Sequence, residues 1–183
     1  MKFMLRLVLL VFLLIQIKDI SAQDEIKFEE PVLISSAGQS ADVKLAGLLL
    51  KKEKVKSETV LIAKPDNLEG KKTLILVPGF SSKGLGAAGI SAEEELERVK
   101  GIIKTANDEN IPIVLLHIGG NARRKGQSDQ FIKLVAESAK YMIVVEQANE
   151  DNFFTNLKDS LNIPLELVAK IPSAAEPLGK LFK

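Results

Sequence analysis

Three short polar segments of the sequence carry side chains suited to binding an anion, and each follows an apolar run. Residues 35–40 are rich in serine, residues 79–89 combine serine and lysine with glycine, and residues 117–129 carry arginine. Hydroxyl groups, guanidinium groups and the free N–H groups at a helix start all donate hydrogen bonds to carboxylate or phosphate oxygens. The candidate ligand-binding residues of these segments are Ser35, Ser36, Gly38, Ser81, Ser82, Lys83, Gly84, His117, Arg123 and Arg124.

The second segment is the most informative, because residues 79–89 contain four glycines. Glycine costs backbone entropy on folding, so this composition indicates a positive φ or a close approach of other atoms. The residues after Gly84 are not the Lys-Ser of a phosphate-binding loop, and no Gly-x-Ser-x-Gly nucleophile elbow occurs in the chain. We expect residues 80–90 to form a long loop that contacts a ligand, with a purely structural glycine-rich loop as the alternative.

The third segment holds the only histidine, His117, and the consecutive cations Arg123, Arg124 and Lys125. A fourth segment, residues 146–154, is acidic and rich in amides. Opposite charges on neighbouring loops would suit a zwitterionic ligand, or the two loops could simply pair with each other.

Composition excludes several classes of function. The chain has no cysteine and one histidine, which argues against disulfides, zinc clusters, iron–sulfur sites and a cysteine nucleophile. Lys plus Arg number 25 and Asp plus Glu 24, so no overall basic field would attract nucleic acid. We therefore expect no cofactor, no metal and no nucleic-acid partner.

The first 22 residues are typical of a secretory signal. Lys2 and Arg6 precede the apolar run 7–15, which is followed by polar residues and by Ile20-Ser21-Ala22. The run is shorter than the roughly 20 residues that span a membrane. We expect cleavage near Ala22, a periplasmic or secreted product without stable membrane insertion, and one α/β domain over residues 23–183; a short membrane anchor is the alternative.

Short apolar runs alternate with longer periodic segments, which predicts parallel βαβ units. Strands are expected at residues 32–34, 59–63, 73–77, 111–116, 141–145 and 165–168. Helices are expected at residues 41–52, from a capping box at Ser91 and Glu94, from a cap at Ser128, from Asp151, and at residues 174–182. The central runs are apolar without alternation, as in strands covered on both faces. The fold class is therefore a three-layer α/β sandwich with a mostly parallel sheet of five to six strands, flavodoxin-like or Rossmann-like.

Residues 65–70 form a short connection that allows two readings. They could close an antiparallel hairpin, or form one helical turn that carries the chain across to a parallel neighbouring strand, which we favour. In parallel sheets, ligands bind beyond the carboxyl ends of the strands where the strand order reverses. The polar segments should therefore lie side by side.

The sequence also resembles a known family. Residues 82–90 with Glu95 and Arg98, and residues 117–120 with Arg124 and the segment 126–129, are similar to an uncharacterised family of exported bacterial single-domain α/β proteins. The resemblance implies export and a single domain but no activity. The layout is similar to flavodoxin-like folds, but the chain has no Trp and its one Tyr, Tyr141, begins a strand, so a flavin is not expected.

Three functions remain open. The leading hypothesis is a module that binds a small anionic or zwitterionic ligand at the strand ends. The second is a hydrolase or transferase that acts on a small polar substrate with Ser81 or Ser82 as nucleophile and His117 as base. The third is an envelope domain that binds another protein. A single cavity shared by Lys83, His117 and Arg124 would favour the first two.

Overall fold

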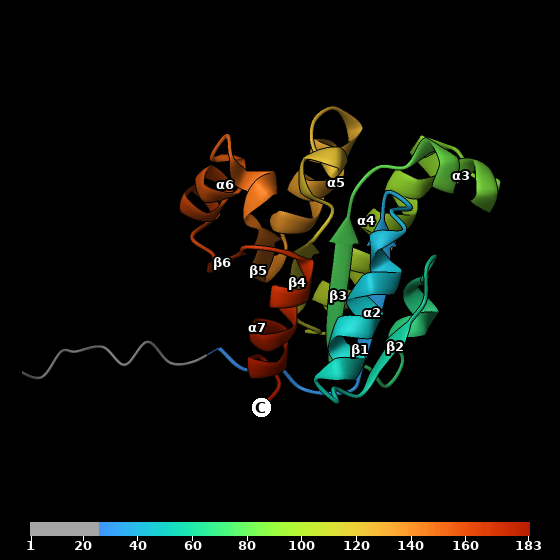
Figure 1. The fold of residues 1–183 in the computed structure, drawn as a ribbon. Coiled ribbons are helices and arrows are strands. Elements are labelled where there is room, and N and C mark those ends of the chain that lie inside the picture. The colour runs from blue at the N-terminus through green and yellow to red at the C-terminus, as the bar shows by residue number, and fades with distance from the viewer. Residues whose placement is uncertain (1–25) are drawn as a thin grey trace, which may run out of the picture.

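The fold is a six-stranded parallel sheet between two layers of helices (Figure 1). The computed structural model describes residues 26–183, so the expected export signal at residues 1–22 lies outside the described residues. The strand order is β2-β1-β3-β4-β5-β6. The strands are β1 Val32–Ala37, β2 Ser57–Thr59, β3 Thr73–Pro78, β4 Ile113–His117, β5 Ala139–Val145 and β6 Leu165–Val168. The predicted α/β fold class is confirmed.

The helices are α2 Asp42–Lys52, α3 Ser82–Ala88, α4 Ala92–Asp108, α5 Gln127–Ala136, α6 Phe153–Leu161 and α7 Ala175–Lys180. All of the helices except α3 pack on one of the two faces of the sheet, and α3 lies beyond the carboxyl ends of the strands (Figure 1). Helices α2 and α7 contact each other on one face, and α4, α5 and α6 form a row on the other. The chain leaves β1 toward one edge of the sheet and β3 toward the other edge. Because crossovers between parallel strands are right-handed, α2 and α4 then lie on opposite faces.

The connection at residues 65–70 is a single helical turn, η1 Pro65–Leu68. Both β2 and β3 pair with β1 in parallel, since Val32 lies opposite Ser57 on one side and Thr73 on the other. The single turn and the parallel direction are therefore confirmed, and a hairpin is excluded. The expectation that the two strands are neighbours was wrong, because β1 lies between β2 and β3. The expected second strand is displaced, however, because regular pairing ends at Thr59 and residues 60–63 follow β1 only loosely.

The segment expected as a long loop contains helix α3. The Ser81 hydroxyl caps it by accepting a hydrogen bond from the Gly84 amide at 3.1 Å, and Gly89 ends it in a left-handed conformation with φ 66°. Good capping at both ends outweighs the helix-weakening glycines inside. The expectation of a loop was wrong here for that reason.

Two further boundaries differ from the prediction. Ser35 and Ser36 belong to β1 rather than to a loop after it. Ser128 does not cap α5, which begins after Gly126; the Ser128 side chain is buried and accepts a hydrogen bond from the Phe80 amide at 3.1 Å. The capping box of Ser91 and Glu94 is present as predicted.

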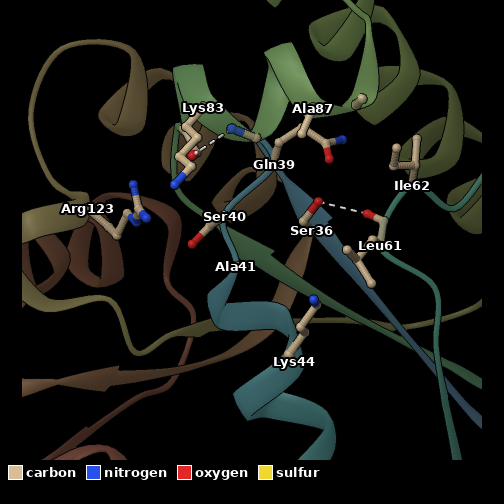
Figure 2. A pocket seen from close by; sticks show the side chains of 13 residues that line it. Ser36, Gln39, Ser40, Ala41, Lys44, Leu61, Ile62, Lys83, Ala87 and Arg123 are labelled. Carbon is tan, nitrogen blue, oxygen red and sulfur yellow. Dashed lines mark hydrogen bonds between the residues drawn. The ribbon is translucent and has the colours of Figure 1, made fainter.

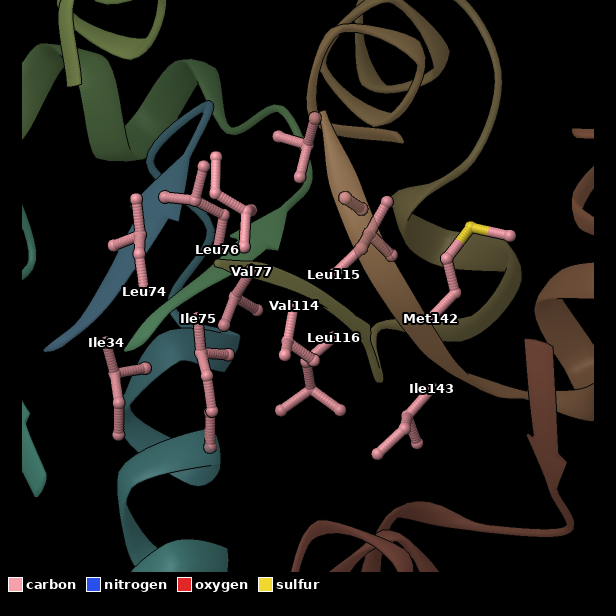
Figure 3. Close-up of a cluster of buried hydrophobic side chains, with 14 of the residues drawn as sticks. Ile34, Leu74, Ile75, Leu76, Val77, Val114, Leu115, Leu116, Met142 and Ile143 are labelled. Atoms are coloured by element: carbon pink, nitrogen blue, oxygen red, sulfur yellow. The ribbon is translucent and has the colours of Figure 1, made fainter. Parts of the chain in front are cut away.

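The core lies on both faces of the central strands. Every residue of β1, β3 and β4 is buried. Figure 3 shows Ile75 and Ile143 directed toward the face that α2 covers, whereas Leu76, Leu115 and Met142 point to the opposite face. This two-sided burial is why the strand sequences do not alternate between apolar and polar residues.

A matched pair of leucines tests this account of the core. Leu115 in β4 is 0% exposed and Leu167 in the edge strand β6 is 41% exposed. We expect Leu115→Ala to lower the free energy of unfolding by about 2 to 5 kcal/mol and Leu167→Ala by less than about 1 kcal/mol. Urea unfolding followed by circular dichroism measures both, and equal losses would contradict the burial described.

Candidate functional site

A pocket of about 520 Å³ lies at the carboxyl ends of β1 and β3 (Figure 2). Its walls come from the residues after β1, the segment after β2, helix α3 and the turn after β4. The lining residues are Ser36, Gln39, Ser40, Ala41, Lys44, Leu61, Ile62, Ser81, Lys83, Gly84, Ala87, Ala88 and Arg123. The chain leaves β1 toward one edge of the sheet and β3 toward the other. This β1–β3 pocket therefore occupies the place where ligands bind in open parallel sheets.

Cationic groups dominate the charge of the β1–β3 pocket. Lys44, Lys83 and Arg123 line it, and no carboxylate is among its lining residues. The neighbouring acid Asp42 is already engaged: its Oδ2 atom accepts a hydrogen bond from the Ser40 hydroxyl at 2.6 Å and lies 3.7 Å from Arg123 Nε. Arg123 also donates to the Phe80 carbonyl at 3.1 Å, which holds its guanidinium at the rim.

A buried ion pair fixes the loop that forms the pocket floor. The Glu95 carboxylate accepts hydrogen bonds from the Gly38 amide and the Gln39 side chain, both at 2.8 Å. Arg98 binds the same carboxylate through Nε at 2.8 Å and Nη2 at 2.7 Å, and it also donates to the carbonyls of Ser36 and Ala63. Every donor and acceptor that this arrangement buries therefore has a partner, which a buried charge requires.

Two glycines allow the backbones around the pocket to touch. A Cβ at Gly84 would overlap the carbonyl oxygen of Gln39, and a Cβ at Gly38 would lie 2.8 Å from the carbonyl oxygen of Gly79. Gly38 also has φ 100°, a conformation that favours glycine. The glycine-rich segment was expected to lie close to other atoms. In the structure, those atoms belong to the backbone of the protein itself.

The ten predicted site residues divide into two groups of five. The β1–β3 pocket brings together Ser36, Ser81, Lys83, Gly84 and Arg123. Those that do not line it are Ser35, Gly38, Ser82, His117 and Arg124. Ser35 lies beneath the pocket, where its hydroxyl accepts from the Ala63 amide at 3.2 Å and donates to the Leu61 carbonyl at 3.3 Å.

His117 is enclosed between the ends of the central strands. Its side chain is fully buried, with Nδ1 3.1 Å from the Pro78 carbonyl, Nε2 3.4 Å from the Gly120 carbonyl and the ring 5.1 Å from that of Phe154. Burial lowers the pKa of His117 below its usual value, and the nearby Arg124 acts in the same direction. His117 and Lys83 therefore do not face a common cavity.

Arg124 joins the third polar segment to the fourth. Its side chain is 3% exposed, with Nε 2.8 Å from Asp129 and Nη2 2.9 Å from Asp151, and it also donates to the Ala148 carbonyl. Its guanidinium lies 4.0 Å from the centre of the Phe153 ring. The hydrogen bond from Arg124 lowers the pKa of Asp151. The third and fourth segments, which were predicted either to bind a zwitterionic ligand or to pair with each other, therefore pair with each other.

Several pocket residues were not predicted. Gln39, Ser40 and Lys44 follow a strand whose start was located correctly, so their position beyond its carboxyl end could have been predicted from the sequence. Leu61 and Ile62 could not, because the second strand was expected to run to residue 63 and to pair along its length. A second pocket of about 620 Å³ lies past β4, β5 and β6, and its charged lining residues are Glu146, Glu150 and Lys170.

Neither a metal cluster nor a membrane span is found in residues 26–183. No group of three or more His, Cys, Asp or Glu side chains there is arranged to hold a metal ion. Within the same residues, no helix combines the length and the apolar character that crossing a membrane requires.

The buried ion pair leads to a stability prediction with a control on the same helix. Glu95 is 0% exposed and Glu97 is 72% exposed, and each pairs with a cation three residues later. We expect Glu95→Gln to cost about 3 kcal/mol or more, because it leaves Arg98 buried without its charge partner, and Glu97→Gln to cost under about 1 kcal/mol. Urea unfolding at pH 7 measures both. Equal effects would show that the network does not stabilise the fold.

His117 leads to a pH prediction. Because its pKa is lowered in the folded state, the unfolded chain binds a proton more readily. Its contribution to stability is thus fully present above about pH 6.5 and is lost as the pH falls through and below that value, by at most about 1.4 kcal/mol per pH unit. The chain has one histidine, so its imidazole Cε1–H resonance needs no assignment, and the midpoint of its pH titration should lie below the usual histidine value. Titration at pH 6.5 or above would contradict the prediction.

The comparisons with known proteins show the family. No curated protein matches this sequence. Among solved structures, the chain is distantly similar to AlinE4, an esterase of the SGNH-hydrolase family, with 12% identity, coverage of 83% of this chain and 81% of that one, and a TM-score of 0.31. A mutant of the same esterase gives 14% identity, coverage of 85% and 84%, and a TM-score of 0.30. These likenesses are too distant to carry an argument about activity. The model of the family described as "Domain of unknown function (DUF6305)" matches residues 29–182, and the chain belongs to this family.

Proposed function

We propose that the protein is a binding module that holds a small anionic ligand in the β1–β3 pocket. The observation that carries this proposal is the meeting of Lys44, Lys83 and Arg123 in one cavity where the strand order reverses. These cations come from three separate segments, so a single charged loop does not account for their convergence.

Hydrogen-bond donors accompany the charge. Arg123 uses one of its N–H groups on the Phe80 carbonyl, and its side chain is still 30% exposed. The Ser81 hydroxyl accepts from the Gly84 amide and so keeps its own proton for a ligand. Ala41 at the start of α2 also lines the cavity, so the positive end of an eleven-residue helix adds to the field.

The alternative functions have less support from the geometry. A hydrolase or transferase that uses Ser81 or Ser82 with His117 needs the base within hydrogen-bond reach of the nucleophile. The ring nitrogens of His117 instead face the carbonyls of Pro78 and Gly120. An envelope interaction domain would present Arg123 and Arg124 outward, whereas Arg124 is buried on two aspartates. We propose that binding takes place in the periplasm or outside the cell, as the export signal predicts.

Single substitutions at the rim test the proposal. We expect Arg123→Gln and Lys83→Gln each to weaken the binding of a small anion about tenfold or more, because each removes a charge-assisted hydrogen bond. Titration calorimetry with acetate, succinate and inorganic phosphate at low ionic strength measures this, and added salt should weaken binding further.

The matched control is Lys125→Gln. Lys125 is exposed and belongs to the same turn region as Arg123, but it does not line the β1–β3 pocket. If no anion binds, or if Lys125→Gln weakens binding as much as Arg123→Gln does, the proposal is wrong.

A further inference from the structure

The β1–β3 pocket has a charged side and an apolar side. Figure 2 shows Lys83 and Arg123 together near Ser40, whereas Leu61 and Ile62 lie on the opposite side of the view. All of these residues line the same cavity, so a ligand in it contacts both kinds of surface. The following inference rests on the proposed anion binding and specifies the chemistry of the ligand.

The apolar side is formed by side chains that water reaches. Leu61 is 42% exposed, and Ile62, Ala87 and Ala88 complete this part of the wall. Covering such surface is favourable in proportion to the apolar area removed from water. The apolar wall therefore rewards a ligand with a hydrocarbon body more than a compact hydrophilic ion.

Leu61 is held in this position by the strand beneath it. Its carbonyl oxygen accepts hydrogen bonds from the Ser36 hydroxyl at 2.8 Å and from the Ser35 hydroxyl at 3.3 Å. These side-chain bonds supplement the loose backbone pairing of residues 60–63 to β1. The leucine side chain is thus presented to the cavity by a fixed backbone, which lowers the entropy cost of packing a ligand against it.

The charges of the pocket distinguish an anion from a zwitterion. An ammonium group needs a carboxylate or several carbonyls to replace its water. Both acids next to the pocket are already engaged. Asp42 is bound by the Ser40 hydroxyl and lies beside Arg123, and Glu95 is bound by Gly38, Gln39 and Arg98. A ligand ammonium group would therefore meet three cations and no available carboxylate.

We infer that the ligand is an amphiphilic anion. Its single acidic head group lies between Lys83 and Arg123, and an aliphatic chain of several carbons lies along Leu61, Ile62 and Ala87. The cavity of about 520 Å³ is within the size range of small-molecule sites, and it suits one short chain better than a whole membrane lipid.

A homologous series of carboxylates tests this inference on the purified protein. Acetate, butyrate, hexanoate and octanoate are titrated as monomers by calorimetry at constant ionic strength. We expect affinity to rise roughly threefold for each added methylene. Octylammonium and the zwitterion 2-aminooctanoate should bind at least about tenfold more weakly than octanoate. Affinity that does not rise with chain length, or a zwitterion that binds as well as octanoate, would overturn the inference.

Leucine variants locate the chain. Leu61→Ser should flatten the dependence of affinity on chain length, because it removes apolar surface from the wall that the chain contacts. Leu167→Ser is the matched control, because Leu167 is equally exposed but lies on the far edge strand β6. Leu61 is solvent-exposed and its backbone bonds are retained in the variant, so loss of folding does not obscure the result. An unchanged slope in Leu61→Ser would overturn the inference.

The two proposals fail in different ways. If acetate and octanoate bind equally and both require Arg123, the anion site stands and the amphiphilic ligand is wrong. If no carboxylate or phosphate binds at all, the anion site itself is wrong. Vesicles of phosphatidylcholine and phosphatidylglycerol form a last arm: capture of the protein by vesicles, reversed by octanoate, would identify a membrane lipid in place of a free carboxylate.

Discussion

The pocket depends on one buried carboxylate. Glu95 extends from the first turn of α4 to the loop after β1, where it accepts the Gly38 amide and the Gln39 side chain, and Arg98 neutralises it. Without that acceptor, the loop would leave a buried N–H group without a partner. A buried charge is costly unless it is paired and hydrogen-bonded, as the Glu95 carboxylate is here. The carboxylate in turn fixes the geometry of the loop after β1.

A buried ion pair supports each half of the sheet edge, but the two pairs leave different side chains facing solvent. Beyond β1 and β3, the ion pair lies below the surface and leaves the cations Lys83 and Arg123 facing a cavity. Beyond β4 and β5, Arg124 is itself the buried charge, held between two aspartates and a phenylalanine ring. The two consecutive arginines therefore differ in role. Arg123 lines the cavity, and Arg124 joins two loops.

Much of the fold could be predicted from the sequence, because strands and helices leave local patterns. Five of the six strands and the capping box at Ser91 were located with small changes of boundary, whereas β2 shares only Thr59 with its predicted range. Helix α3 was missed because its glycines weaken a helix locally, while its two caps decide the outcome. Only five of the ten predicted site residues line the pocket, and the reason is different. Whether His117 or Arg124 points inward depends on Phe154, Asp151 and other partners far along the chain, which no local pattern reveals.

Helix α3 packs against the rest of the protein through few buried side chains. Leu85 is its only buried residue, whereas the strands beneath it are buried throughout. Regions with few buried apolar contacts open locally at a free energy far below that of global unfolding. The wall of the pocket that carries Lys83 and Ala87 is therefore its least stable side. Unfolding of α3 alone would therefore open this side of the cavity further while the core remains folded.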